Sequence, residues 1–167
     1  RVTPPHVHRP MKLSSLNDDL AEAGFAPSTK VLSYEMREST QDEAEQLDIP
    51  QGEGLLAVRR LRYADNHPLA LLTNLIPLDI APTWQELGEN GLYRCLSARI
   101  VEVTSARQVI GAREATAKEA QELGETEGAP LLTMNRTGYA TDGRVIEVGQ
   151  HVYRPSLYSF HFSLFTS

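Results

Sequence analysis

Two arginines, Arg60 and Arg62, lie two residues apart in a stretch whose side chains alternate as in a β-strand. Side chains at this spacing leave the same face of a sheet, so both guanidinium groups point to one side and Arg59 points to the other. Such a pair can hold a carboxylate or phosphate through paired hydrogen bonds. The alternative is a solvated sheet face with cross-strand ion pairs, each contributing less than about 1 kcal/mol.

An internal repeat indicates which of these positions could contact a ligand. A single offset of 76 residues aligns 37–64 with 113–140 without a gap and gives 12 identities in 28 positions, where unrelated sequences would give about 2. The repeated units extend over about 14–77 and 90–153. Two such units are expected to pack about a pseudo-twofold axis, with a ligand cleft between them.

Positions at which the two copies differ are the candidate ligand contacts. A shared fold needs the same core residues in both halves, whereas a ligand without twofold symmetry needs different side chains at the cleft. Arg60 recurs as Arg136, but Arg62 aligns with Gly138 and Leu71 aligns with Glu147. We therefore predict that Arg60 and Arg62 clamp an anionic group and that Glu147 accepts hydrogen bonds from hydroxyl or amine groups.

The offset also makes two predicted helix starts equivalent, one at Ser14 and Ser15 and one at Gly91. Helix N-termini present unpaired N–H groups and the positive end of the helix dipole, so they can bind anions. Ser15 could serve such a site. It could equally be a simple helix cap.

The elements that must position these residues follow from the hydrophobic pattern. Each unit is predicted to contain a helix, a strand, a short helix and a strand hairpin, which together form an α+β fold with helices packed on an antiparallel sheet. Thr40 with Glu43 forms a capping box, and Thr116 with Glu119 repeats it. A final strand is expected from alternation over 158–164.

Composition limits the class of protein. The 167 residues carry a formal net charge of −6, so the chain lacks the excess of positive charge that is typical of nucleic-acid-binding domains. The single Cys95 suggests a reducing, cytoplasmic compartment, and no apolar run approaches the roughly 18 residues of a membrane span. Residues 1–11 contain Pro4, Pro5 and Pro10 and indicate an extended linker from a preceding domain, so 12–167 would be the ligand-binding domain.

No constellation of residues predicts catalysis, a metal or a cofactor. His6 and His8 alternate in a proline-rich segment, where histidines are more often solvated than metal-bound. The chain has neither a nucleophile elbow nor a glycine-rich phosphate loop. We expect a binding protein without a cofactor.

Several segments resemble a known family when their order and spacing are taken together: LSSLNDDLAEAG from Leu13, VRRLRYADNHPLALLTNLIP from Val58, GLYRCL from Gly91, and the stretch from Glu147 through VYRPSLYSF. They resemble the UTRA effector-binding domain of GntR-superfamily, HutC-subfamily regulators. The resemblance covers about Lys12 to Phe165. It implies a chorismate-lyase-like fold, a homodimer, and operator DNA binding through an N-terminal winged helix-turn-helix that this chain lacks.

The resemblance also implies roles for individual residues. By analogy with members that sense sugar phosphates, the positions of the anion-holding group are Ser15, Arg60, Arg62 and Tyr93, and those holding the polar remainder of the ligand are Glu147 and Tyr153. Gly91 stands where phosphate binders often carry serine, although its backbone N–H can still serve. Leu72 and the segment Pro155-Ser156-Leu157 also depart from the family pattern, so a carboxylate effector is as compatible as a sugar phosphate.

Three functions are therefore considered. The first is a sensor in which a small anionic metabolite changes the arrangement of separate DNA-binding domains. The second, since that fold also occurs in chorismate lyase, is an enzyme acting on a small carboxylate. The third is a dimerisation module without a ligand.

Overall fold

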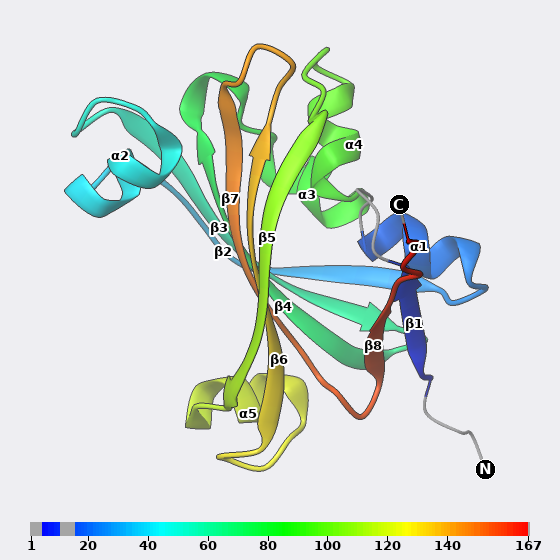
Figure 1. Ribbon diagram of the computed structural model, residues 1–167. Coiled ribbons are helices and arrows are strands. Elements are labelled where there is room, and N and C mark those ends of the chain that lie inside the picture. The colour runs from blue at the N-terminus through cyan, green and yellow to red at the C-terminus, as the bar shows by residue number, and fades with distance from the viewer. Residues whose placement is uncertain (1–4, 11–15, 167) are drawn as a thin grey trace.

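A computed structural model describes residues 5–10 and 16–166 of the chain. Its main feature is a six-stranded antiparallel sheet in the order β2-β3-β4-β7-β6-β5, with a separate two-stranded sheet of β1 and β8. Figure 1 shows the strong twist of the large sheet. The predicted α+β class, with helices on an antiparallel sheet, is confirmed.

The elements of each repeat occur in the predicted order of helix, strand, helix, strand, strand. The bounds are β1 (Val7–Pro10), α1 (Leu16–Glu22), β2 (Pro27–Glu38), α2 (Gln41–Leu47), β3 (Gly54–Ala64), β4 (His67–Pro77), a 3-10 turn (Leu78–Ile80), α3 (Trp84–Glu89), α4 (Leu92–Ser97), β5 (Ser105–Glu114), α5 (Ala117–Leu123), β6 (Pro130–Tyr139), β7 (Val145–Tyr153) and β8 (Tyr158–His161). Both predicted capping boxes are present, at Thr40 and at Thr116. The first unit is thus α1-β2-α2-β3-β4, and the second is α4-β5-α5-β6-β7.

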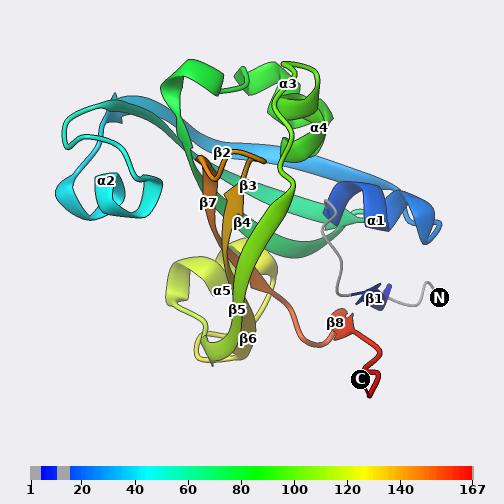
Figure 2. The same cartoon turned by 45° about the horizontal axis from the view of Figure 1, so that its top comes forward.

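The helices divide between the two faces of the sheet. On the α1/α4 face, Leu20 of α1 and Leu96 of α4 belong to two buried clusters that include Leu72 and Val58 of the sheet. On the α2/α5 face, Leu47 and Leu123 pack against the opposite side. Figures 1 and 2 show α1, α3 and α4 apart from α2 and α5. Each unit alone leaves an apolar sheet face open, and packing two units together covers it.

A pseudo-twofold axis relates the two units and passes between Thr73 and Gln150. These residues are paired directly across β4 and β7. The flanking pairs, Leu72 with His151 and Asn74 with Gly149, exchange under a rotation about that point. The predicted internal symmetry is therefore present in the structure, and its axis lies at the centre of the sheet.

The uniform offset of 76 residues is wrong for the last strand of each unit. Arg62 pairs with Ala70 in the first hairpin, whereas Gly138 pairs with Glu147 in the second. Arg62 and Gly138 are 76 residues apart, but Ala70 and Glu147 are 77 apart. The counterpart of Glu147 is therefore Ala70 and not Leu71, which belongs to a cluster on the α2/α5 face.

The hairpin turns explain the extra residue. In the first hairpin, Ala64 pairs with His67, so the loop is Asp65 and Asn66, both with positive φ; this is the favoured two-residue turn. In the second hairpin, the Ala140 amide donates to the Arg144 carbonyl at 2.9 Å, which leaves three residues in the loop, 141–143. Side chains of a strand alternate between the two faces of the sheet. After the longer loop, an offset of 76 therefore aligns residues that lie on opposite faces, and an offset of 77 aligns residues on the same face.

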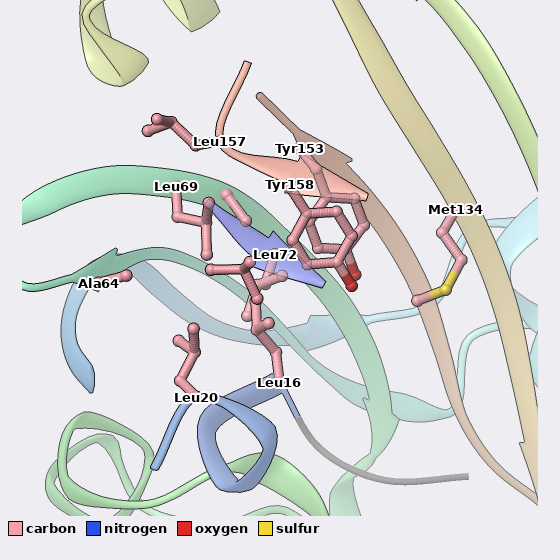
Figure 3. Close-up of a cluster of buried hydrophobic side chains, with 11 residues drawn as sticks. Leu16, Leu20, Ala64, Leu69, Leu72, Met134, Tyr153, Leu157 and Tyr158 are labelled. Carbon is pink, nitrogen blue, oxygen red and sulfur yellow. The ribbon is translucent and has the colours of Figure 1, made fainter. Parts of the chain in front are cut away.

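The segment near the N-terminus is part of the folded structure. Within the predicted linker, β1 runs parallel to β8, and the Val7 amide donates to the Leu157 carbonyl at 2.6 Å. Val7 is buried in the cluster that contains Tyr153 and Tyr158, whose stacked rings Figure 3 shows. The predicted final strand is shorter than expected, because β8 ends at His161 and the later apolar side chains, including Leu164, are exposed.

Candidate functional site

The candidate site is a small cavity on the α1/α4 face, beside the pseudo-twofold axis. Its volume is about 30 Å³, which is room for one or two water molecules. Four of the lining residues come from the central strands β3, β4 and β7, two from α4, and one from β6. They are Arg60, Asn74, Leu92, Tyr93, Arg136, Glu147 and His151. Sequence analysis predicted Arg60, Tyr93 and Glu147, and the structure brings these three together.

Arg60 is the cation of this cavity. Its side chain is 2% exposed, so the interpretation of a solvated sheet face is wrong for this residue. Its Nη2 donates to Asn74 Oδ1 at 3.2 Å, while Nε and Nη1 have no hydrogen-bond partner among the described residues. Burial lowers the pKa of Arg60 to about 10, so it remains a cation at neutral pH. Buried guanidinium N–H groups without acceptors are energetically costly, and an anion would satisfy them.

Glu147 is the anion of the cavity and is 1% exposed. Its Oε1 accepts from the Tyr93 hydroxyl at 2.8 Å, and its Oε2 accepts from Asn74 Nδ2 at 3.1 Å. Burial raises the pKa of Glu147 above the usual carboxyl range, although the charge of Arg136 and these hydrogen bonds act in the opposite direction. Burial likewise raises the pKa of Tyr93, which keeps its hydroxyl a donor.

A β-bulge directs Glu147 into the cavity. The β6–β7 register shifts between Gly138 and Tyr139, which leaves Ile146 without a partner on β6. Ile146 packs on the α1/α4 face, and its neighbour Glu147 contacts residues of that same face. Bulges commonly re-aim a side chain in this way.

Two glycines make room for the converging polar groups. A Cβ atom at Gly138 would lie 3.2 Å from the Tyr93 hydroxyl and 3.3 Å from Glu147 Oε1. A Cβ atom at Gly149 would lie 3.0 Å from Asn74 Nδ2 and 3.2 Å from Glu147 Oε2. The replacement of Arg62 by Gly138 in the second copy therefore has a structural reason, since a side chain there would collide with the Tyr93–Glu147 contact.

Arg136, the counterpart of Arg60, contributes a second positive charge. It is 5% exposed and lies over the Tyr93 ring, with its guanidinium carbon 5.5 Å from the ring centroid. Its Nε donates to Gln108 Oε1 at 2.7 Å. The stacking and this hydrogen bond fix the guanidinium beside Glu147.

Arg62 lies on the predicted face but does not line the cavity. Both Arg60 and Arg62 act electrostatically on the Cys95 thiol of α4, whereas Arg59 forms a bidentate pair with Glu122 of α5 on the other face. Arg62 is 1% exposed and donates from Nη1 to the Thr29 hydroxyl. The predicted placement of the arginine pair is confirmed, and a joint clamp on one anion stays a prediction.

Two further predicted site residues, Tyr153 and Gly91, are not among the described residues that line the cavity. Tyr153 lies behind it, with its hydroxyl 3.0 Å from His151 Nδ1. Gly91 is buried and caps α4 without itself lining the space. Ser15 lies outside the described residues; α1 begins at the next residue, Leu16.

Asn74, His151 and the role of Arg136 were not predicted from the sequence. Asn74 and His151 are 77 residues apart and occupy equivalent places about the axis. Asn74 pairs with Gly149, and His151 pairs with Leu72, which is the counterpart of Gly149. The constant offset of 76 instead aligned Asn74 with Gln150. Comparing the lengths of the two hairpin loops, two residues against three, is the signal that could have revealed this equivalence.

Two larger hollows lie open to solvent, in part along the α2/α5 face. One includes Arg59 and Arg113, and the other includes Arg107 and Gln150. Arg59 and Arg113 are each held bidentately by a glutamate. These hollows contain no buried cation without an acceptor in the described chain, so we select the small cavity at Arg60 as the site.

Other site types find no support in the part of the chain that the structure describes. It contains no cluster of three or more histidine, cysteine or carboxylate side chains that could hold a metal. None of its helices is long and apolar enough to cross a membrane.

Comparison with known proteins identifies the family. Residues 22–159 match the model of the UTRA domain. The HTH-type transcriptional repressor NagR of Bacillus subtilis is 28% identical over 165 residues, which cover 95% of this chain and 67% of NagR. This chain thus spans about two thirds of the length of that relative.

Solved structures agree with this assignment. A protein of Streptomyces coelicolor described as a transcriptional regulator is 43% identical, with a TM-score of 0.77 over 86% of this chain and 96% of that one. The effector domain of PhnF from Mycobacterium smegmatis has the same fold, with a TM-score of 0.89 at 22% identity over 96% of this chain and all of that domain. The relatives are named as regulators, so the lyase interpretation is set aside. The chain belongs to the UTRA domain family, and the relatives that it matches are named as transcriptional regulators.

Proposed function

We propose that this domain senses a small anionic metabolite, a sugar phosphate or a carboxylate, in the cavity at Arg60. The observation that carries the proposal is the buried Arg60 guanidinium, whose Nε and Nη1 have no acceptor among the described residues. An effector oxyanion would accept from these two groups. Hydroxyl or amine groups of the effector would donate to Glu147, whose carboxylate lies within the same cavity.

Entry of the effector requires the cavity to widen. A volume of about 30 Å³ holds no metabolite of that size. Tyr93 and Glu147 both line the cavity, and their hydrogen bond links α4 to the sheet. Because α4 has only six residues, Leu92–Ser97, its displacement is the simplest opening motion. Effector binding would then select a conformation with α4 moved away from Glu147.

The signal would leave the domain through β8 and β1. His151 lines the cavity and contacts the Tyr153 hydroxyl, and the Tyr153 ring stacks on Tyr158 at a centroid distance of 4.2 Å. Tyr158 lies in β8, opposite Val7 of β1. We propose that an N-terminal DNA-binding domain precedes β1 in the full-length regulator, which acts as a homodimer on operator DNA. The helix-turn-helix in the name of NagR supports this arrangement.

Calorimetric titration of sugar phosphates and carboxylates tests the proposal. Arg60→Ala should abolish binding of any compound that the unchanged domain binds. Arg59→Ala is the matched control, because Arg59 is the adjacent residue on the opposite face and is held by Glu122. Equal affinity of the Arg60 variant and the unchanged domain would remove Arg60 from the site.

A further inference from the structure

Arg60 and Glu147 are both buried and line the same cavity, but among the described residues each forms its hydrogen bonds with a residue other than its opposite charge. Glutamates elsewhere in the described chain hold arginines directly through two hydrogen bonds of 2.5–2.7 Å. These pairs are Arg37–Glu43, Arg59–Glu122, Arg99–Glu86 and Arg113–Glu119. Arg60 and Glu147 are far more buried than these side chains, so their mutual attraction is screened less by solvent. We therefore looked for a group that holds the Arg60 guanidinium and the Glu147 carboxylate apart.

The side-chain amide of Asn74 stands between the two charges. Its Oδ1 accepts from Arg60 Nη2 at 3.2 Å, and its Nδ2 donates to Glu147 Oε2 at 3.1 Å. The two charges determine this orientation, because the reversed amide would place N–H groups against the guanidinium and a carbonyl oxygen against the carboxylate. Gly149 keeps the space for the amide, since a Cβ atom there would lie 3.0 Å from Asn74 Nδ2.

We propose that Asn74 is a positioning residue that prevents Arg60 and Glu147 from closing into an ion pair, and so reserves both for an effector carrying an anion and a hydrogen-bond donor. This inference rests on the proposed anion site and names the class of ligand for it. The neutral amide of Asn74 forms one hydrogen bond with Arg60 and one with Glu147, and it neutralises neither charge. The remaining Arg60 N–H groups and the free lone pairs of Glu147 then recognise opposite ends of the same molecule.

An aspartate or a small apolar residue at position 74 would not do this. Aspartate would pair with Arg60 directly and repel Glu147. Alanine would remove the spacer and let the two buried charges approach, because their attraction in a site of low dielectric is strong. In both cases the anion of the effector would compete with an internal carboxylate for Arg60.

The test compares four forms of the domain: unchanged, Asn74→Ala, Glu147→Gln and the double variant. Calorimetry measures binding of propyl phosphate and of 2-aminoethyl phosphate, which have similar length but differ in the terminal donor. The unchanged domain should bind the amine at least about tenfold more tightly. Asn74→Ala should weaken propyl phosphate binding by about tenfold or more. The double variant should bind propyl phosphate within about threefold of Glu147→Gln, since no carboxylate is left to capture Arg60.

The recovery of propyl phosphate binding in the double variant distinguishes a positioning role of Asn74 from a simple structural role. If Asn74 only supported the local fold, removing the charge of Glu147 would not restore binding, and the proposal would be wrong. Asn74→Asp provides a second variant should the alanine form be unstable, and it should also lose propyl phosphate affinity. Asn135→Ala is the matched control, because it removes an exposed amide from β6, where Asn135 pairs with Gln150 of β7.

A crystal structure of Asn74→Ala without ligand separates this proposal from the anion site itself. We expect a direct contact between the Arg60 guanidinium and the Glu147 carboxylate. Charges that remain apart in the variant would overturn the spacer role, whatever the binding data show. A direct contact, together with no binding of any phosphate or carboxylate by the unchanged domain, would support the spacer role and refute the proposed anion site.

Discussion

Arg60 and Arg136 occupy equivalent positions in the two repeats, and both act on the single carboxylate of Glu147. The counterpart of Glu147 in the first repeat is Ala70, which carries no charge. Two buried guanidinium groups therefore share one buried carboxylate, and the cavity has an excess of positive charge. This imbalance arises because the arginine was retained in both copies while the acidic residue is present in only one.

Replacing Arg60 by methionine should abolish anion binding without lowering stability. Arg60 is 2% exposed and has two N–H groups without an acceptor among the described residues. A buried donor without an acceptor costs about 1–3 kcal/mol, and an apolar side chain of similar length removes this cost while still filling the space. Thermal unfolding and calorimetry measure the two effects. A clear fall in the unfolding midpoint would show that Arg60 has a structural role that its contacts do not reveal.

Gly149→Ala should destroy the site and destabilise the domain. The added Cβ would lie 2.9 Å from His151 Nε2 and 3.0 Å from Asn74 Nδ2, so the lining residues must move, at a cost of about 1–3 kcal/mol. Gly88→Ala in α3 is the control, because its nearest contact would be an ordinary 4.0 Å to Val31; a helical alanine should stabilise by about 0.5–1 kcal/mol. Chemical unfolding curves and effector titrations give both quantities. Unchanged affinity in Gly149→Ala would place the effector elsewhere.

Stability should fall as the pH decreases from about 5 towards 2. Hydrogen bonds from an arginine lower the pKa of Glu43, Glu86 and Glu119 to about 2 in the folded domain. Their pKa in the unfolded chain is about 4.5, so the stabilisation is complete above that value and is lost as the folded carboxylates take up protons. Urea unfolding across this pH range measures the slope.

Glu43→Gln and Glu119→Gln should each flatten that pH dependence and lower stability at neutral pH. These residues are equivalent in the two repeats, and each completes a capping box and binds an arginine. The effect per residue should be modest, since the pairs are partly exposed and screened by solvent. An unaltered slope in both variants would assign the acid sensitivity to other groups.

Tyr158→Leu should uncouple the cavity from β1 while leaving effector affinity within about threefold. The change removes the ring that stacks on Tyr153, but leucine still fills part of the apolar cluster. Hydrogen exchange of the Val7 amide, which donates to the Leu157 carbonyl, reports the coupling. In the unchanged domain effector binding should alter this exchange rate, and in the variant it should not. Tyr63→Leu, on the α2/α5 face, serves as the control.

Much of the architecture could be predicted from local patterns. The repeated Thr40–Glu43 and Thr116–Glu119 boxes are confirmed because a capping box depends on residues three apart. The opposite directions of Arg59 and Arg60 follow from the two-residue period of a strand. The duplicated order of elements likewise followed from identities spread along the chain.

The site itself depended on contacts that no local pattern contains. One extra residue in the loop 141–143 changes which side chains are equivalent in the two halves, and a β-bulge turns Glu147 into the cavity. Asn74 was missed because its importance comes from lying between Arg60 and Glu147, which are distant in sequence.

The amino-acid sequence by itself determined the repeated elements, their order and the strand faces, because helix caps and strand alternation depend on residues a few positions apart. Only the tertiary structure decided that Arg60 is buried with N–H groups lacking acceptors among the described residues, and that Asn74 separates it from Glu147. Burial and charge separation are properties of the packed sheet and helices, since they depend on which strands and helices the fold places around a side chain.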